Sequence, residues 1–166
     1  MTILELAVVL VIIAILASML LPFYGAMKAR AEEGKCLANI RGLHVAASSY
    51  LNSNGSWPQI PVQLSEDNPH AYARNWVEVL APFGGPHASW ICPTLQRSLG
   101  IPFSAIDEED HYRIDFLPSS FDSDPATPRR AGGYPWFMER IASHPRGQLI
   151  ILADGTATAL LDIVNK

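Results

Sequence analysis

The first 27 residues, MTILELAVVLVIIAILASMLLPFYGAM (Met1–Met27), decide the fold and the environment of this chain. They contain 22 hydrophobic residues and a single charged side chain, that of Glu5. The 22 positions Leu6–Met27 are all uncharged, and a helix of that length spans ~33 Å, enough to cross the hydrocarbon core of a bilayer. The sequence therefore predicts a transmembrane helix at the N-terminus.

A cleaved secretory signal explains this segment less well. No Lys or Arg precedes Lys28, and the apolar run is longer than that of a signal peptide. The nearest basic residues, Lys28, Arg30 and Lys35, lie on the C-terminal side, where the positive-inside rule predicts the wrong orientation for an exported domain. We therefore expect that a basic leader has been removed and that the chain is numbered from a processed end.

The composition of the rest of the chain is that of one modest domain. Of 166 residues 49% are hydrophobic, but residues 28–166 alone are only ~42% hydrophobic, which is ordinary for a soluble domain. Acidic residues outnumber basic ones by 16 to 12, and no basic run is longer than Arg129–Arg130. Disorder and collagen-like repeats are excluded, and nucleic acid is not an expected partner.

Glu5 is the residue that needs an explanation. A carboxylate in an apolar membrane segment costs ~2.5–3.5 kcal/mol at the bilayer centre and less near its edge. One interpretation is that Glu5 caps the first helical turn or reaches the headgroups. The other is that it pairs with a cation, and the nearest candidate is the N-terminal amine of a neighbouring subunit.

The N-terminal residues resemble a known family. Met1–Pro22, with Thr2, Glu5 and Pro22, is similar to the mature N-terminus of type IV pilins and type II secretion pseudopilins, with Met1 in place of the commoner Phe. The segment KCLANIRGLHVAASSYLNSNGSWP resembles pilin-like proteins of planctomycetes and verrucomicrobia, as do two shorter motifs (residues 35–58, WICP at 90–93, ILADG at 151–155).

The resemblance implies a function. A prepilin peptidase would cut before Met1 and methylate its amine, the subunit would wait in the inner membrane, and the assembly machinery would add it to a helical filament, either an extracellular pilus or a periplasmic pseudopilus. Glu5 would neutralise the Met1 amine of an adjoining subunit, and Thr2 would help to place that amine. Pro22 removes a backbone donor, so a kink or unwound stretch is expected just before it.

Two alternatives to a major pilin stay open: a secretion pseudopilin or minor pilin, and a membrane-anchored periplasmic enzyme or binding module. The sequence offers no catalytic constellation. It has no Gly-rich phosphate loop and no GxSxG motif, and its five histidines form no metalloprotease pattern (His44, His70, His87, His111, His144). We predict that the chain is not an enzyme, that it has no cofactor, and that the histidines lie scattered on the surface.

The predicted architecture is α+β, the type IV pilin fold: a long N-terminal helix on a small antiparallel sheet with loop-rich regions. Its parts are a hydrophobic helix (1–27), an amphipathic continuation (28–54) and a globular head (55–166). The helix should end near Asn52, before Gly55. Later elements are a helix from Asn68–Pro69 to Leu80, strands at 90–92 and 112–117, and a hairpin (148–153 and 156–163) with the two-residue turn Asp154–Gly155.

Cys36 and Cys92 are the only cysteines. In an exported chain an even pair predicts a disulfide, here between the long helix and the head, and two buried free thiols are the alternative.

A run of acidic residues is a weak candidate for calcium binding, because oxygen-rich loops suit this ion (Asp107, Glu108, Glu109, Asp110, Asp122, Asp124). No EF-hand spacing is present, and a solvated charged loop is the favoured interpretation.

Overall fold

The computed structural model describes residues 2–128 and 133–160, without the side chains of residues 20–22. It divides into two compact units, Met1–Glu32 and Glu33–Lys166. Each unit is described by itself.

A single long helix, α1 (Ile3–Asn54), runs through the first unit and into the second. It ends as predicted. Gly55 adopts a left-handed conformation with φ of 73°, and its N–H donates to the Leu51 carbonyl at 2.9 Å. Glycine has no Cβ to clash in this conformation, so it stops the helix at low cost.

By length and hydropathy, no single helix in the described part of the chain is a candidate membrane span. Ile3–Met19 and Phe23–Asn54, which are bent at a short break, are a candidate only as a pair.

The second unit contains a four-stranded antiparallel sheet in the order β1-β2-β3-β4. Its strands are β1 (Phe116–Pro118), β2 (Pro135–Glu139), β3 (Leu149–Leu152) and β4 (Ala157–Ala159). The register pairs Leu117 with Met138, Met138 with Ile150, and Ile150 with Thr158. The predicted α+β class, with a long helix and a small antiparallel sheet, is therefore confirmed.

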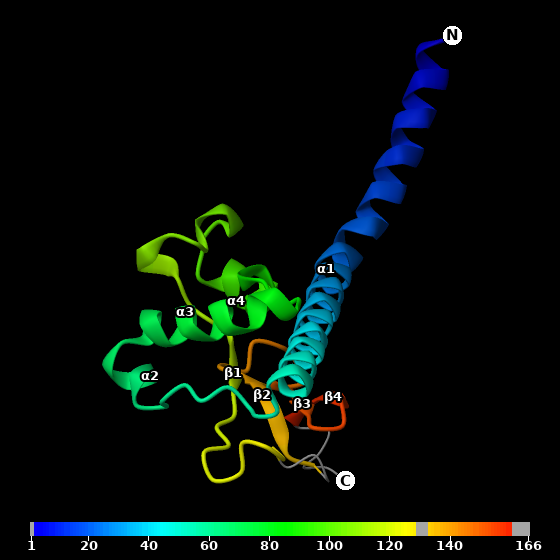
Figure 1. Ribbon diagram of the computed structural model, residues 1–166. Helices are drawn as coiled ribbons and strands as arrows, with labels where there is room; N and C mark the ends of the chain where they lie inside the picture. Colours follow the sequence, from blue (N-terminus) through cyan, green and yellow to red (C-terminus); the bar gives the residue numbers. More distant parts are fainter. Residues whose placement is uncertain (1, 129–132, 161–166) are drawn as a thin grey trace. The chain divides into compact units, whose positions relative to one another are not determined.

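Short helices complete the second unit (Figure 1). Asn68 caps α3 with its side chain, which accepts the Ala71 N–H at 3.0 Å, so the predicted helix from Asn68–Pro69 to Leu80 is confirmed. The helices are α2 (Leu64–Asp67), α3 (Pro69–Leu80), α4 (Pro93–Ser98) and the 3-10 turns η1 (Ala81–Phe83), η2 (His87–Trp90), η3 (Phe103–Ala105) and η4 (Glu109–His111).

The core joins the second half of α1 to the sheet and to α3. The predicted apolar stripe of α1 supplies five fully or almost fully buried residues (Cys36, Ile40, Leu43, Ala47, Leu51). Trp57 fills the centre, with its ring 4.9 Å from that of Trp136 and 5.1 Å from that of Phe121. Its Nε1–H donates to the Ser119 carbonyl at 3.0 Å, so the indole is satisfied as well as buried.

Two predicted strands are wrong in whole or in part. Residues 90–92 form no strand: Trp90 ends η2, and Cys92 precedes α4, where Pro93 occupies the first helical position that proline favours. Of residues 112–117 only the last two belong to β1. Asp115 lies just before β1: its N–H donates to the Trp90 carbonyl at 2.8 Å, its carbonyl accepts the Arg140 N–H at 2.7 Å, and its carboxylate accepts the Cys92 N–H.

The predicted hairpin at 148–163 exists, but its turn has three residues instead of two. Leu152 N–H donates to the Thr156 carbonyl at 2.9 Å, which leaves Ala153, Asp154 and Gly155 in the loop. Gly155 has φ of 85°, the left-handed conformation typical of the last loop residue in such hairpins. Asp154 accepts the Thr156 N–H, so it is a turn residue, as predicted. The second strand of the hairpin, β4, ends at Ala159, and residues 161–163 of the predicted strand lie outside the described residues.

Candidate functional site

The first turn of α1 contains a reciprocal cap. The Thr2 N–H donates to Glu5 Oε2 at 2.7 Å, and the Glu5 N–H donates to Thr2 Oγ1 at 3.3 Å. This is a capping box, in which two side chains satisfy amide groups that have no partner within the helix. In the isolated chain Glu5 therefore caps its own helix, one of the two roles considered for it. Met1 lies outside the described residues.

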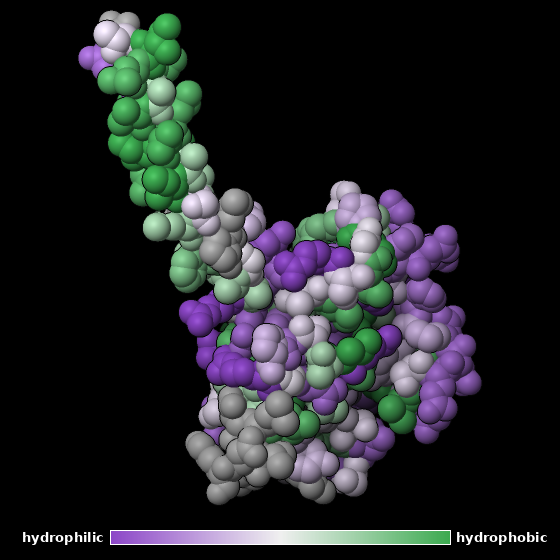
Figure 2. All heavy atoms as spheres, turned by 180° about the vertical axis from the view of Figure 1, so that it is seen from behind, coloured by the Kyte–Doolittle hydropathy of each residue, from purple (hydrophilic) through white to green (hydrophobic). Residues whose placement is uncertain are grey.

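The side chains that follow are apolar and exposed. Ile3 is 89% exposed, Leu10 58% and Met19 62%, and the large residues between them are exposed by about half or more. Neighbouring residues of a helix point ~100° apart, so the consecutive exposed run Val8–Ile13 covers every side of the helix. Figure 2 shows this continuous hydrophobic surface on the N-terminal segment. A helix that is apolar on all sides is stable only where something covers it.

A second group of functional interest lies inside the second unit, where four ionisable side chains meet. Cys36 comes from α1, Cys92 from the turn before α4, Glu139 from the end of β2, and His144 from the loop that follows β2. The two cysteines and Glu139 are 0% exposed, and His144 is 6% exposed. In the described part of the chain, Cys36, Cys92 and His144 are the one group of three potential metal ligands whose donor atoms lie within 4.8 Å of one another.

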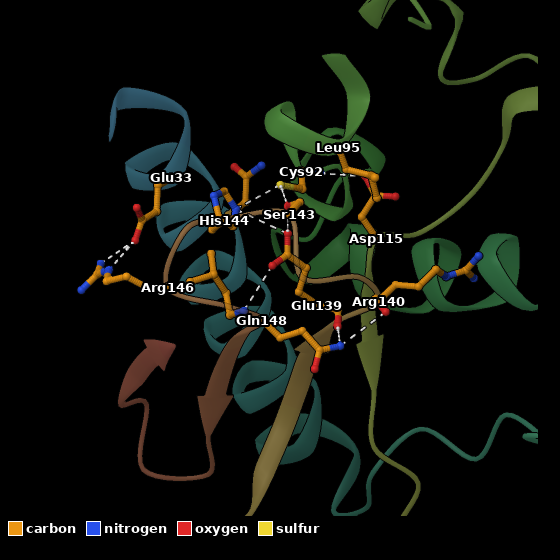
Figure 3. A network of polar contacts seen from close by, with 12 residues as sticks. Glu33, Cys92, Leu95, Asp115, Glu139, Arg140, Ser143, His144, Arg146 and Gln148 are labelled. Carbon is orange, nitrogen blue, oxygen red and sulfur yellow. Dashed lines mark hydrogen bonds and ion pairs between the residues drawn. The ribbon is translucent and has the colours of Figure 1, made fainter. Parts of the chain in front are cut away.

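His144 is at the centre of this group (Figure 3). Its Nε2 lies 3.4 Å from Cys92 Sγ and 3.4 Å from Glu139 Oε1. Burial opposes the charge of His144, but its hydrogen bonds to Cys92 and Glu139 outweigh burial and raise the pKa of His144 to about 10. One imidazolium proton therefore lies between two buried anions.

The pKa values of the two thiols are shifted in opposite directions. A hydrogen bond from Cys36, assisted by His144, lowers the pKa of Cys92 to about 5 against the opposing effect of burial. That same bond, together with burial, raises the pKa of Cys36. The contacts of Cys92 Sγ with the Ser143 hydroxyl at 3.5 Å and with His144 Nε2 at 3.4 Å favour the thiolate form at Cys92 over that at Cys36.

Backbone and hydroxyl groups hold Glu139 in place. Its Oε1 accepts the Ser143 hydroxyl, and its Oε2 accepts the Leu149 N–H at 3.2 Å. Burial favours the neutral acid, but these bonds and the bond from His144 prevail and lower the pKa of Glu139. The loop that carries His144 is also tied to α1, because Arg146 Nε donates to Glu33 Oε1 at 2.9 Å.

The predicted disulfide is not formed in this structure. Cys36 and Cys92 are brought together, but both are free thiols, which was the alternative considered from the sequence. The pairing was predicted from the even number of cysteines alone, and that argument contains no information about the histidine and the carboxylate that share their site.

The six acidic residues considered for calcium do not gather into one site. Asp107 pairs with His87 at 2.7 Å, Glu108 approaches His111 at 3.9 Å, and Asp124 accepts the Thr127 hydroxyl. Within residues 2–128 and 133–160 no three of them bring carboxylate oxygens together as a potential metal site.

The prediction that all histidines lie scattered on the surface is wrong for two of them. His87 is 8% exposed, and its two ring nitrogens contact Asp107 and the Arg113 carbonyl. His144 was missed as a candidate site residue because two of its neighbours in space, Cys36 and Cys92, are distant in sequence. The one local signal is Glu139, a charged residue that ends the apolar segment PWFM.

Comparisons with protein-family models, with curated proteins and with solved structures found no match.

Proposed function

We propose that the chain is a structural subunit, the major pilin, of an extracellular helical filament similar to type IV pili, assembled from the inner membrane through its N-terminal helix. The observation that carries this proposal is the helical surface of residues 3–19 and 23–27, which is apolar on all sides and exposed. Lipid covers such a surface before assembly, and the corresponding helices of other copies cover it in the filament.

Glu5 favours a filament over a simple anchor. An anchor needs apolar residues alone, and a carboxylate within it only weakens insertion. In a bundle of these helices Glu5 would be surrounded by apolar side chains, and the N-terminal amine of the next copy supplies the opposite charge. A buried charge that loses its partner costs ~3–5 kcal/mol, so this pairing would set which helices associate and in what register.

Because Glu5 is part of a capping box, substitutions can separate its capping role from its proposed pairing with an amine. Glutamine replaces glutamate in capping boxes, because its side-chain oxygen also accepts the backbone N–H, but it carries no charge. If Glu5 only caps the helix, Glu5→Gln assembles normally. If Glu5 neutralises a neighbouring amine, both Glu5→Gln and Glu5→Val lower the filament yield about 100-fold or more, which corresponds to the loss of ~3 kcal/mol.

The measurement is the amount of subunit in sheared fibres relative to the amount in the cell envelope. Glu66→Gln is the matched control, since Glu66 is an exposed acid in α2 of the second unit, and it should leave the yield unchanged. A normal filament yield for Glu5→Gln would show that Glu5 does not pair with the N-terminal amine of a neighbouring subunit.

The other two candidates make different predictions. A pseudopilin or minor pilin would remain in the envelope, with few or no surface fibres composed of it. A membrane-anchored enzyme or binding module would keep its activity when Glu5 is replaced, because the anchor would still insert.

A further inference from the structure

We infer that Cys36, Cys92 and His144 bind a structural zinc ion, with Glu139 facing the fourth position. The inference concerns the second unit alone and does not depend on the filament. Its starting point is the donor set: two thiol sulfurs and an imidazole nitrogen, all within 4.8 Å of one another and buried.

The distances suit tetrahedral zinc. Bonds of about 2.3 Å to sulfur and about 2.0 Å to nitrogen or oxygen place neighbouring ligand atoms roughly 3.3–3.8 Å apart. Cys92 Sγ lies 3.4 Å from His144 Nε2, and His144 Nε2 lies 3.4 Å from Glu139 Oε1. Since no pair among the three donor atoms exceeds 4.8 Å, shifts of at most about 1 Å bring them onto one ion.

Zinc would take the place of protons in this cluster. Without metal, His144 Nε2 lies 3.4 Å from both Cys92 Sγ and Glu139 Oε1, and Cys36 Sγ lies within 4.8 Å of the other two donor atoms. Sulfur binds zinc as a thiolate and imidazole binds through an unprotonated nitrogen, so the protons that these groups carry are released to solvent and the freed lone pairs bind the metal.

The ligand types select the metal. Thiolate and imidazole ligands suit zinc, whereas calcium and magnesium take oxygen ligands. The three ligands are buried, and Glu139 Oε1 lies 3.4 Å from one of them, His144 Nε2, so a carboxylate is near the fourth position, as suits a closed structural zinc site better than an open catalytic one. The ion would link α1, the turn before α4 and the loop after β2, three segments that are far apart in sequence.

A disulfide between Cys36 and Cys92 uses the same sulfurs but explains less of the site. Its formation removes both thiol protons and two electrons, so it needs an oxidant, and the bond formed is neutral. His144 and Glu139 would then lie buried against two sulfurs that need neither of them. A metal uses all four groups.

The test uses full-length protein in detergent, purified with a phosphine reductant that keeps the thiols reduced. Zinc content is measured by elemental analysis before and after titration with zinc chloride, and cobalt(II) is then substituted for zinc. We expect one equivalent of zinc per chain. We also expect the intense visible bands of tetrahedral cobalt and the ultraviolet bands of cobalt–thiolate bonds, with the intensity of two sulfurs.

Variants assign the ligands. Cys36→Ser, Cys92→Ser and His144→Asn should each weaken zinc binding by more than the ~10–100-fold that is typical when only a hydrogen-bond partner of a ligand is changed. His87→Asn is the matched control, because His87 is the other buried histidine and lies outside the site, so it should retain one equivalent. The cobalt spectrum of the wild-type protein counts the sulfurs even where a variant fails to fold.

Two outcomes overturn the inference. The first is a reduced, folded wild-type protein that binds less than a tenth of an equivalent of zinc or gives the weak spectrum of octahedral cobalt. The second is a protein that, when isolated from the cell envelope without reductant, is 2 Da lighter than the reduced chain, which shows that the sulfurs form a disulfide in place.

Discussion

Both halves of α1 contain leucine and other apolar residues, but these side chains have opposite environments in the two halves. Leu10 in the first half is 58% exposed, while Leu43 in the second half is fully buried. The second half alternates polar and apolar residues at helical spacing and covers its stripe with the sheet and α3, as an amphipathic helix does in a globular protein. The first half has no polar face, so no fold of this chain alone would cover it. One half of the helix therefore stabilises the second unit, whereas the other half contributes nothing to that core and is the part that we propose connects subunits.

Removal of the first half is expected to have the largest effect on assembly and the smallest on the head. A variant that begins at Lys28 loses every residue of the exposed apolar surface and no residue of the buried core. It should be soluble without detergent, form no filaments, and melt within about 2 °C of the full-length head. Calorimetry and sedimentation measure both properties. Unfolding of the truncated head would contradict the division of roles.

The same substitution placed in each half sharpens the comparison. Leu43→Ala removes a fully buried side chain and should lower the free energy of unfolding by ~2–5 kcal/mol, a drop of roughly 10 °C in the melting temperature. Leu10→Ala should leave the unfolding of the subunit unchanged and weaken the filament, where Leu10 would be covered. Equal effects on subunit unfolding would show that the first half also packs within the subunit.

The pH dependence of stability should come from the second unit. In metal-free, reduced protein, the pKa of Cys92 falls from 9.0 to about 5, so its contribution is present above pH 9 and is lost as pH falls through 5. The pKa of His144 rises from 6.5 to about 10, so its contribution is present below pH 6.5 and is lost as pH rises through 10.

Their sum is a plateau of stability from about pH 6.5 to 9, with losses of roughly 1–2 kcal/mol toward pH 5 and pH 10. Chemical denaturation across this range measures it. A Cys92→Ala variant should lose the slope toward pH 5 and retain a weaker slope toward pH 10, because Glu139 still faces His144. Identical profiles for the variant and the wild type would contradict the ion pair.

The smallest effects come from two helix caps, Thr2 at the start of α1 in the first unit and Asn68 at the start of α3 in the second unit. Thr2→Ala and Asn68→Ala each remove a capping side chain, and each should cost ~1 kcal/mol of local helix stability. Asn68→Ala should lower the global stability of the head, whereas Thr2→Ala should only speed hydrogen exchange in the first turn of α1. Asn68→Asp, which preserves the acceptor, is the control.

Sequence patterns predicted the elements whose signals are local. The long helix, its end at Gly55 and the cap at Asn68 each follow from a periodicity or a capping residue. β2 was not predicted, because its residues PWFME do not alternate: Trp136 and Phe137 are both buried, although they are neighbours. The register of β2 is irregular between Pro135 and Phe137, and both rings contact Trp57. Such an irregularity breaks the period-two pattern from which strands are recognised.

The buried cluster was beyond the reach of sequence patterns for a different reason. Cys36 and Cys92 were noticed because cysteines are rare here, but the partners that decide their chemistry, Glu139 and His144, are brought to them only by the packing of β2 and its loop against α1. No spacing rule connects these four positions. Similarly, the composition alone showed that the first half of α1 is apolar. It could not show whether Glu5 caps the helix, and only the structure reveals the capping box between Thr2 and Glu5.

We expect the first half of α1 to be covered by other copies of this chain. This can be tested by electron microscopy of fibres sheared from cells, with their protein identified by mass spectrometry. Wild-type cells should yield fibres whose main component is this chain, and cells with the Glu5→Gln variant should yield none. A chain that is abundant in the cell envelope but absent from every fibre, even when overproduced, would contradict it.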